Sequence, residues 1–264
     1  MLYATDGLVI RETDVGEHDK LLTLLTPSEG QISVSAKGAR SSKCRLAGVS
    51  KLFTYGNYEI YKKGDYRYIK DASVIEPFFG LSSDIEKMSA AAYFCDIACD
   101  ITGEGVPSIE ILRMTLNSFY ALSKGIKSTP LVKAVYEIRA AGYSGFMPEL
   151  EHCALCGETN PARPVLDVMN GRLLCASCRQ KIENARQKEL ATSLDAPYVS
   201  IYCRLSPSSL AALRFSLSAL PERMFSFDLT EEGELAIFSH ACETYLLNHL
   251  ERDFSTLKFY KSLF

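Results

Sequence analysis

Four cysteines near the middle of the chain stand in two closely spaced pairs. Cys153 and Cys156 form the first pair, and Cys175 and Cys178 form the second after eighteen intervening residues. This spacing is typical of a structural zinc site, because each pair supplies two thiolates to one tetrahedral metal. We therefore predict one structural Zn²⁺ held by these four cysteines. The alternative is two redox-active or disulfide-bonded pairs, but a thioredoxin-like dithiol usually follows a strand in a βαβ unit, and no such unit is visible.

The residues around the cysteines predict how they are positioned. Gly157 allows the backbone to turn tightly behind the metal, and two short apolar runs flank Asn170-Gly171, a strong signal for a hairpin turn. A helix-compatible run follows from Arg179 to Leu190. Two cysteine-pair turns joined by a hairpin and followed by a helix indicate a zinc-ribbon-like module at about residues 150–190. Four thiolates fill the coordination of zinc and leave no position for a catalytic water.

Four cations lie in or beside this module: Arg163, Arg172, Arg179 and Lys181. Four thiolates around one Zn²⁺ leave a net negative charge on the centre. We interpret these cations first as charge balance for the metal centre, and only second as a contact for DNA or a partner.

A basic block lies in the N-terminal part of an acidic chain. The whole chain has a net charge of −3, whereas residues 31–70 have a net charge of +7. The densest part is residues 37–45, where four cations are separated by small residues that we expect not to pack a core: Lys37, Arg40, Lys43 and Arg45, with Lys51 following. Cations in such a setting neutralise phosphates and release counterions, so we predict that these five bind DNA. The alternative is a solvated β-surface on which lysines protect the sheet edge.

Six aromatic residues accompany the basic block: Phe53, Tyr55, Tyr58, Tyr61, Tyr66 and Tyr68. Aromatic side chains beside cations on a barrel face form a stacking surface for single-stranded bases. Alternating tyrosines in strands usually serve sheet packing instead. We therefore expect only one or two of the six to contact bases.

The elements that must position the basic block are strands. Apolar runs at about 7–13, 20–26, 31–36, 53–61 and 66–74 are separated by short turns. Five short strands without a helix in the first forty residues predict a closed barrel, for which the OB-fold is the commonest five-stranded choice. The predicted core residues are Leu8, Ile10, Leu22, Leu24, Ile32, Val34 and Ile60.

From residue 83 onward the apolar spacing becomes helical. We expect helices at about 83–102, 108–124, 131–141, 206–220 and 231–250, the first opening at a capping box on Ser83. Its predicted inward residues are Ile85, Met88, Ala92, Cys95, Cys99 and Ile101. The predicted fold is therefore α+β, with an OB-fold domain at 1–80 and an α-helical domain at 81–264 that carries the four-cysteine module.

Missing motifs and composition exclude several function classes. The sequence has no phosphate-binding glycine loop, dinucleotide fingerprint, H-E-x-x-H or G-x-S-x-G, so we predict a protein that is not an enzyme. It opens without an apolar leader and has no run of about 20 apolar residues that could span a membrane. Nine cysteines in a chain without an export signal fit a reducing cytoplasm.

Three stretches of the sequence resemble the RecO family of bacterial DNA repair proteins. These are residues 6–26 with 30–40, the stretch 142–157 that leads into the first cysteine pair, and the closing segment 257–263. The resemblance implies an OB-fold joined to a helical domain with a zinc module. It also implies a recombination mediator that binds single- and double-stranded DNA and anneals complementary strands.

The same resemblance implies partners and site residues. Partners would be RecR, the acidic C-terminal tail of the single-strand binding protein SSB, and through them RecA, in a bacterial cytoplasm and at the nucleoid when acting. The family's basic DNA-binding stretch falls on Lys37, Arg40, Lys43 and Arg45, and its zinc ligands fall on the four paired cysteines.

Two further hypotheses remain open at this stage. The chain could be chiefly a zinc-stabilised interaction scaffold that docks the SSB tail and binds little DNA itself, with Arg113, Lys133 and Arg139 as candidate docking residues. A third interpretation is a zinc-dependent nuclease or a translation-type OB factor.

Overall fold

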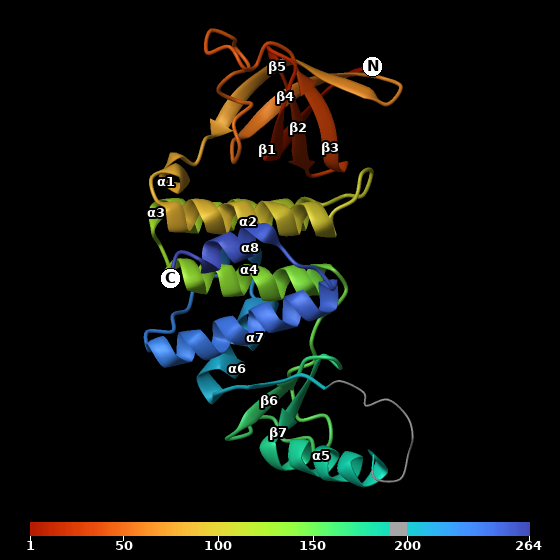
Figure 1. The fold of residues 1–264 in the computed structure, drawn as a ribbon, viewed down its shortest axis with the longest axis vertical. Coiled ribbons are helices and arrows are strands. Elements are labelled where there is room, and N and C mark those ends of the chain that lie inside the picture. Colours follow the sequence, from red (N-terminus) through yellow and green to blue (C-terminus); the bar gives the residue numbers. More distant parts are fainter. Residues whose placement is uncertain (191–199) are drawn as a thin grey trace. The chain divides into compact units, whose positions relative to one another are not determined.

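The computed structural model describes residues 1–190 and 200–264, and these residues form two compact units (Figure 1). The first unit comprises Met1–Thr129 with Phe254–Phe264, and the second comprises Pro130–Asp253. The expected boundary at residue 80 falls inside the first unit, so a division into domains at that point stays a prediction. None of the described helices combines the length and the hydrophobicity that a membrane span requires.

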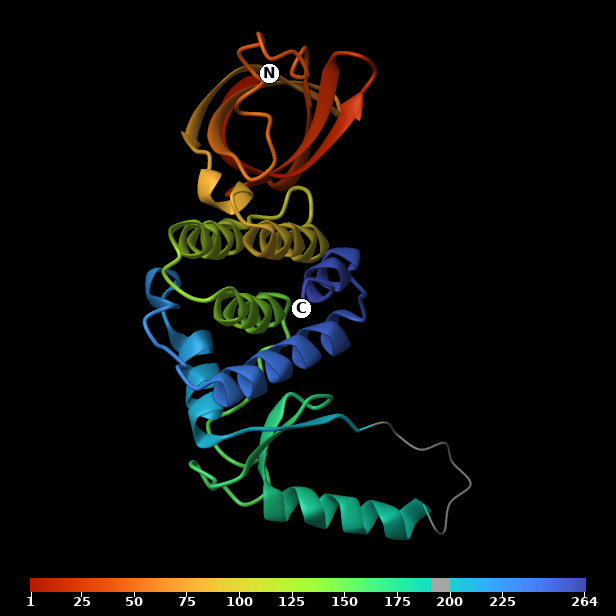
Figure 2. The same cartoon turned by 60° about the vertical axis from the view of Figure 1, so that its left-hand side comes forward.

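The first unit begins with five strands: β1 (Leu2–Val15), β2 (Asp19–Thr26), β3 (Gly30–Ala36), β4 (Tyr55–Lys63) and β5 (Tyr66–Glu76). They close into a barrel in the order β1-β2-β3-β5-β4, which Figure 2 shows as a ring. Neighbouring strands are antiparallel except β3 and β5, which are parallel. The predicted five-stranded OB-fold barrel is confirmed.

The interior of the barrel is filled with apolar side chains. Five predicted core residues belong to it: Leu22, Leu24, Ile32, Val34 and Ile60. Leu8 and Ile10 are also buried, but Val9 rather than either of them lies in this core. Because side chains alternate along a strand, Leu8 lies on the outer face of the barrel wall. A register shift between Val9 and Arg11 then disturbs the alternation at Ile10.

Four helices complete the first unit: α1 (Phe79–Ser82), α2 (Ile85–Ile101), α3 (Ile109–Lys124) and α8 (Ser255–Lys261). The N-cap of α2 is Asp84 rather than the predicted Ser83, and its carboxylate accepts hydrogen bonds from the two backbone N–H groups of Glu86 and Lys87. The predicted inward positions Ile85 and Met88 are exposed. The buried residues of α2 extend around more than one face, so its sequence does not define one apolar stripe.

The second unit combines helices with a small sheet. Its helical elements are α4 (Thr129–Tyr143), α5 (Ala176–Leu190), α6 (Pro207–Ser218), the 3₁₀ turn η1 (Pro221–Arg223) and α7 (Glu232–Leu250). Residues 131–141 of α4 are all buried, which makes α4 the central helix of this unit. The sheet has the order β7-β6-β8, formed by β6 (Pro164–Asp167), β7 (Arg172–Cys175) and β8 (Tyr202–Arg204). The hairpin predicted around Asn170-Gly171 is confirmed as β6–β7, whereas β8 was not predicted.

Candidate functional sites

The basic segment predicted to bind DNA forms the connection between β3 and β4. Three of its apolar residues, Ala39, Leu46 and Val49, belong to the barrel core, so the expectation that residues 37–45 pack no core is wrong at Ala39. Consecutive backbone hydrogen bonds, such as Cys44 N–H to Ser41 O at 2.9 Å, fold it into a series of turns. The segment is therefore held against the barrel by its apolar residues, and its cations lie outside.

The two arginines of this segment are already paired. Arg40 Nε lies 3.3 Å from Asp14 Oδ2, and the same guanidinium donates to the carbonyl of Gly16. Arg45 places a terminal nitrogen 2.6 Å from Asp71 Oδ1. Both pairs are substantially exposed, so solvent screens them and each contributes little to stability. Each arginine must nevertheless loosen its carboxylate before it can bind a phosphate.

The three lysines of the segment are less constrained. Lys37 Nζ lies 5.4 Å from the ring centroid of Tyr68, within the range of a cation–π interaction. Lys43 and Lys51 are exposed and form no ion pair with any residue that the structure describes. Among the five predicted DNA-binding cations, the lysines are thus the ones whose charge is available to an anion.

One further cation of the basic block is not available. Arg67 is only 7% exposed, and its guanidinium lies 2.7 Å from Glu104 Oε1 and 3.6 Å from Glu29 Oε2. The net charge of residues 31–70 therefore overstates the positive charge on the surface of the barrel.

Three tyrosines gather on one face of β4 and β5. Tyr61 and Tyr68 are directly opposite each other in the ladder, with ring centroids 5.2 Å apart, and Tyr66 lies 6.1 Å from Tyr68. Tyr66 is 52% exposed. With Lys37 above Tyr68, these residues form an aromatic and cationic face, which we call the tyrosine face (Lys37, Tyr61, Tyr66 and Tyr68).

The other three predicted aromatic residues are not on this face. Tyr58 is buried in the barrel and donates its hydroxyl to Val49 O at 2.9 Å. Phe53 precedes β4 with a left-handed backbone, φ 68°, and packs edge-on against Phe119. Tyr55 is half-buried and its hydroxyl donates to an Asp6 carboxylate oxygen at 3.4 Å. Phe53 and Tyr58 are buried and cannot stack on bases, and the expectation that only one or two of the six aromatic residues contact bases stays a prediction.

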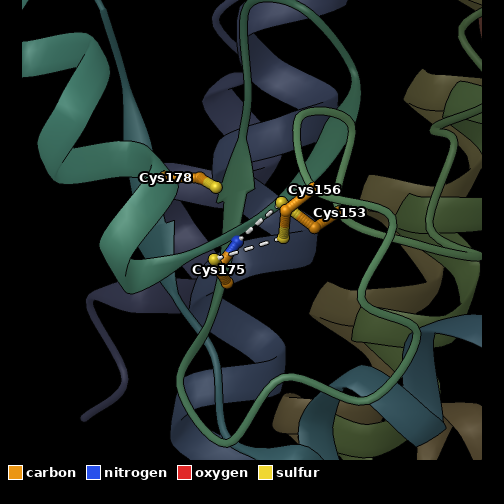
Figure 3. Close-up of side chains that lie close together, drawn as sticks. All are labelled: Cys153, Cys156, Cys175 and Cys178. Carbon is orange, nitrogen blue, oxygen red and sulfur yellow. Dashed lines mark hydrogen bonds between the residues drawn. The ribbon is translucent and has the colours of Figure 1, made fainter.

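The four paired cysteines come together in the second unit (Figure 3). Their Sγ atoms all lie within 4.8 Å of one another, and three of the four residues are buried. A tetrahedral Zn²⁺ with bonds of about 2.3 Å would place its sulfur ligands about 3.8 Å apart. The arrangement therefore fits one metal ion after a small contraction, and no other cluster of this kind occurs among the described residues.

Local structure explains why the cysteines converge. Gly157 has φ +77° directly behind the first pair, Cys175 ends β7, and Cys178 lies in the first turn of α5. The N–H of Cys175 donates to Cys153 Sγ at 3.3 Å. Burial raises the pKa of the Cys153 thiol, but hydrogen bonds from the backbone N–H groups of Leu155, Cys156 and Cys175 outweigh it and lower this pKa to about 6. Cys153 thus favours the thiolate, which is the form that binds metal, whereas a hydrogen bond with Cys175 raises the pKa of Cys178 to about 12.

The cations near the cysteine cluster have unequal surroundings. Arg172 Nε lies 3.0 Å from Asp167 Oδ2, and Arg179 is 2.6 Å from Glu183 Oε2. Arg163 and Lys181 are exposed and form no ion pair within residues 1–190 and 200–264. Two of the four cations interpreted as charge balance therefore already have carboxylate partners.

Two of the three residues proposed to dock an acidic tail are buried. Lys133 is 2% exposed and lies 2.8 Å from both Glu137 and Glu243. Arg139 is also buried and donates to the carbonyls of Ser216 and Ala219 at the end of α6. These two predictions are wrong, because neither side chain can reach a partner on the surface. Arg113 is exposed, 3.4 Å from Glu110 Oε1.

Comparisons with known proteins cover most of the chain. Residues 1–78 match the family described as "Recombination protein O N terminal", and residues 82–195 match "Recombination protein O C terminal". A "DNA repair protein RecO" of Acetivibrio thermocellus is 29% identical over 259 residues, which cover 98% of this chain and 96% of the relative. The protein of that name from Caldicellulosiruptor bescii is 31% identical over 193 residues, covering 73% and 79%. That from Listeria monocytogenes is 31% identical over 176 residues, covering 67% and 68%.

Proposed function

The chain belongs to the RecO family of DNA repair proteins, and from this premise we propose that it is a recombination mediator that acts directly on DNA. It binds single- and double-stranded DNA, anneals complementary strands, and helps to load a RecA-type recombinase onto SSB-coated DNA together with a RecR-type partner. No step of this activity breaks or forms a covalent bond. The protein acts in the bacterial cytoplasm, at the nucleoid.

The observation that carries this proposal is the tyrosine face beside the basic segment. The exposed ring of Tyr66 and the half-buried rings of Tyr61 and Tyr68 offer surfaces on which bases stack. Lys37, Lys43 and Lys51 offer charge that pairs with no carboxylate of the described chain. Rings and cations on one small barrel suit single strands, whose bases and phosphates are both accessible. Arg40 and Arg45 join the contact by exchanging Asp14 and Asp71 for phosphates.

Annealing follows from the same charges. Two complementary strands repel each other through their phosphates, and cations that contact both strands offset this repulsion while counterions are released. The bases are then free to pair. The protein supplies charge and alignment, and base pairing supplies the specificity.

We further propose that the cysteine cluster holds Zn²⁺ and that the metal is structural. Cys153, Cys156, Cys175 and Cys178 together occupy all four positions of a tetrahedral zinc. The metal then joins the loop before β6, the end of β7 and the start of α5. Its contribution is to the folding of the second unit.

The alternative is that the chain mainly docks the acidic SSB tail and binds little DNA itself. Burial of Lys133 and Arg139 removes two of its candidate residues and leaves Arg113. Titration of a labelled acidic tail peptide and of labelled DNA against the same protein separates the two functions. Tail binding without DNA binding would favour the scaffold.

The experiment that tests DNA binding compares two variants with equal loss of charge. The variant K37A/R40A/K43A/R45A removes four cations from the basic segment, and R113A/K124A/R223A/R252A removes four exposed cations elsewhere. For single strands the log–log slope of affinity against salt is about −0.7 per phosphate contact. We expect the first variant to flatten the slope by about two to three, and the second to leave it near that of the wild type. An unchanged slope in the first variant would remove the basic segment from the proposed site.

A further inference from the structure

A pocket of 460 Å³ in the second unit lies between α5 and the strands β6 and β8. Three arginines line it, Arg163, Arg179 and Arg204, together with the amide of Gln180 and an apolar wall that includes Val165 and Leu205. No sequence pattern groups Arg204 with the other two arginines. β8 brings Arg204 beside β6 from a position about forty residues along the chain.

Backbone hydrogen bonds fix the two outer arginines. Arg163 directly precedes β6, and its carbonyl accepts a hydrogen bond from Ala176 N–H at 3.1 Å. Arg204 faces Val165 across the β6–β8 ladder, and Leu205 N–H donates to Pro164 O at 2.9 Å. The backbones of both arginines are therefore set by the sheet rather than by a free loop.

The third arginine is oriented by its neighbours. The guanidinium carbon of Arg179 lies 5.1 Å from the ring centroid of Tyr202, and a terminal nitrogen lies 2.6 Å from Glu183 Oε2. Tyr202 and Arg204 are two residues apart on β8 and so point to the same face of the sheet. The Nε of Arg179 is buried and has no hydrogen-bond partner in the described chain. One donor of the pocket is thus left without an acceptor.

The charge of the pocket is not balanced by the described residues. Glu183 pairs with Arg179, whereas the exposed Arg163 and Arg204 form no ion pair with any residue at 1–190 or 200–264. The two uncompensated charges of Arg163 and Arg204 repel each other, and an anion in the cavity would relieve that repulsion. The planar forks of guanidinium groups match the oxygens of a phosphate, each through paired hydrogen bonds.

We propose that this arginine pocket (Arg163, Arg179 and Arg204) binds a phosphate group of a nucleic-acid strand. Its volume is in the range of sites for small ligands, so it admits a phosphate with the attached sugar. The apolar wall beside the arginines gives the sugar a surface to pack on. The identity of the ligand rests on the proposed DNA binding, whereas the site is separate from the barrel segment. The protein then holds DNA at two places, one in each unit.

The test is the variant R163Q/R204Q, which should retain the fold because both arginines are exposed and form no ion pair with the residues that the structure describes. We expect single-stranded DNA to bind about tenfold more weakly at low salt, because hydrogen bonds to charged groups are lost, and the log–log salt slope to fall by about 0.7. The matched control R223Q/R252Q removes two exposed cations of the same unit that do not line the pocket, and its affinity should stay near that of the wild type. The variant R163K/R204K keeps the charge without the fork and should lie between the two.

Further measurements distinguish the possible outcomes. Binding of R163Q/R204Q is measured with one oligonucleotide that carries a terminal phosphate and with the same oligonucleotide without it. A larger loss of affinity for the phosphorylated form would assign the pocket to a strand end, and equal losses would assign it to an internal phosphodiester. DNA binding unchanged in R163Q/R204Q, while wild type binds, would overturn the pocket but not the proposed function. Loss of the bound metal in this variant would also overturn it, by assigning the arginines to charge balance. Absence of DNA binding by the wild type would instead remove the proposed function, and the ligand of the pocket with it.

Discussion

The cysteine cluster and the basic segment of the barrel place their reactive groups in opposite ways. In the cluster, three of the four cysteines are buried, and backbone turns and strand ends hold the sulfur atoms together. In the basic segment, Ala39, Leu46 and Val49 are buried and the cations are left on the surface. The cysteine cluster is therefore largely shielded from solvent with its four sulfur atoms close together, whereas the cations of the basic segment are accessible to an anion in solution.

This difference decides what each region can do. Four convergent thiolates complete the coordination of one metal, so the cluster contributes to folding and leaves no open position for chemistry. In the basic segment, acids distant in sequence decide which cations can bind a phosphate. Asp14 and Asp71 pair with Arg40 and Arg45, so the cations available to an anion are the three lysines. We therefore expect the cluster to determine stability and the barrel surface to determine affinity.

The largest expected effect is the loss of the metal. Cys175→Ser removes one thiolate, and structural zinc contributes folding free energy of the order of 10 kcal/mol in small modules. We expect the purified variant to lack stoichiometric zinc and to show loss of the second unit's folded signal in far-ultraviolet circular dichroism. Cys44→Ser, which changes a cysteine outside the cluster, serves as the control and should retain both. Full metal content and unchanged unfolding in Cys175→Ser would contradict a structural metal site.

The next effect separates two tyrosines that look alike in the sequence. Tyr58→Ala empties a buried position in the barrel core and should cost about 3–5 kcal/mol of unfolding free energy, as large-to-small aromatic changes do. Tyr66→Ala changes an exposed ring and should alter stability by less than about 0.5 kcal/mol, yet weaken binding to single-stranded DNA by about 1–3 kcal/mol. Urea unfolding and fluorescence titration measure the two quantities. A loss of stability in Tyr66→Ala with no loss of affinity would make the tyrosine face a packing feature.

A smaller effect concerns the unpaired lysines. The variant K37A/K43A/K51A should flatten the log–log salt slope for single-stranded DNA by about two, from roughly 0.7 for each lost contact. Its urea midpoint should match that of the wild type, because none of the three lysines forms an ion pair within the described chain. A shifted midpoint with an unchanged slope would show that the lysines hold the barrel rather than DNA.

The smallest effect is expected for the paired arginines. R40A/R45A removes two exposed ion pairs, each contributing about 1 kcal/mol or less, and should change the salt slope less than the three-lysine variant does. The reason is that Asp14 and Asp71 compete with phosphates for these guanidinium groups. The side-by-side salt titration of both variants decides the ranking. If R40A/R45A changed the salt slope more than the three-lysine variant, DNA phosphates would displace Asp14 and Asp71 readily from the two arginines.

The sequence predicted those parts of the protein that depend on short-range spacing. The four cysteines, the hairpin around Asn170-Gly171 and the five barrel strands all follow from patterns within a few residues. In the barrel wall all seven predicted core residues are buried, but the pattern did not show that Val9, rather than Leu8 or Ile10, faces the barrel interior.

Other features depend on contacts between distant residues and could not be predicted. Phe53 is buried because α3 brings Phe119 against it, and Arg67 is buried because Glu29 and Glu104 meet there. Arg204 joins the arginine pocket through the three-residue strand β8, which is too short to show a period. The residues next to Phe53, Arg67 and Arg204 in the sequence do not indicate burial or a shared pocket. These features follow only from contacts with residues far away in the chain.

The most direct test of the central claim, that single-stranded DNA lies on the tyrosine face, is photocross-linking. An oligonucleotide that carries 5-iodouracil is irradiated in the complex, and the cross-linked peptides are identified by mass spectrometry. Because stacked rings are the preferred sites of such cross-links, we predict adducts at Tyr66 or Tyr68 and none at the buried Tyr58. Cross-links found only outside residues 31–70 would contradict the claim.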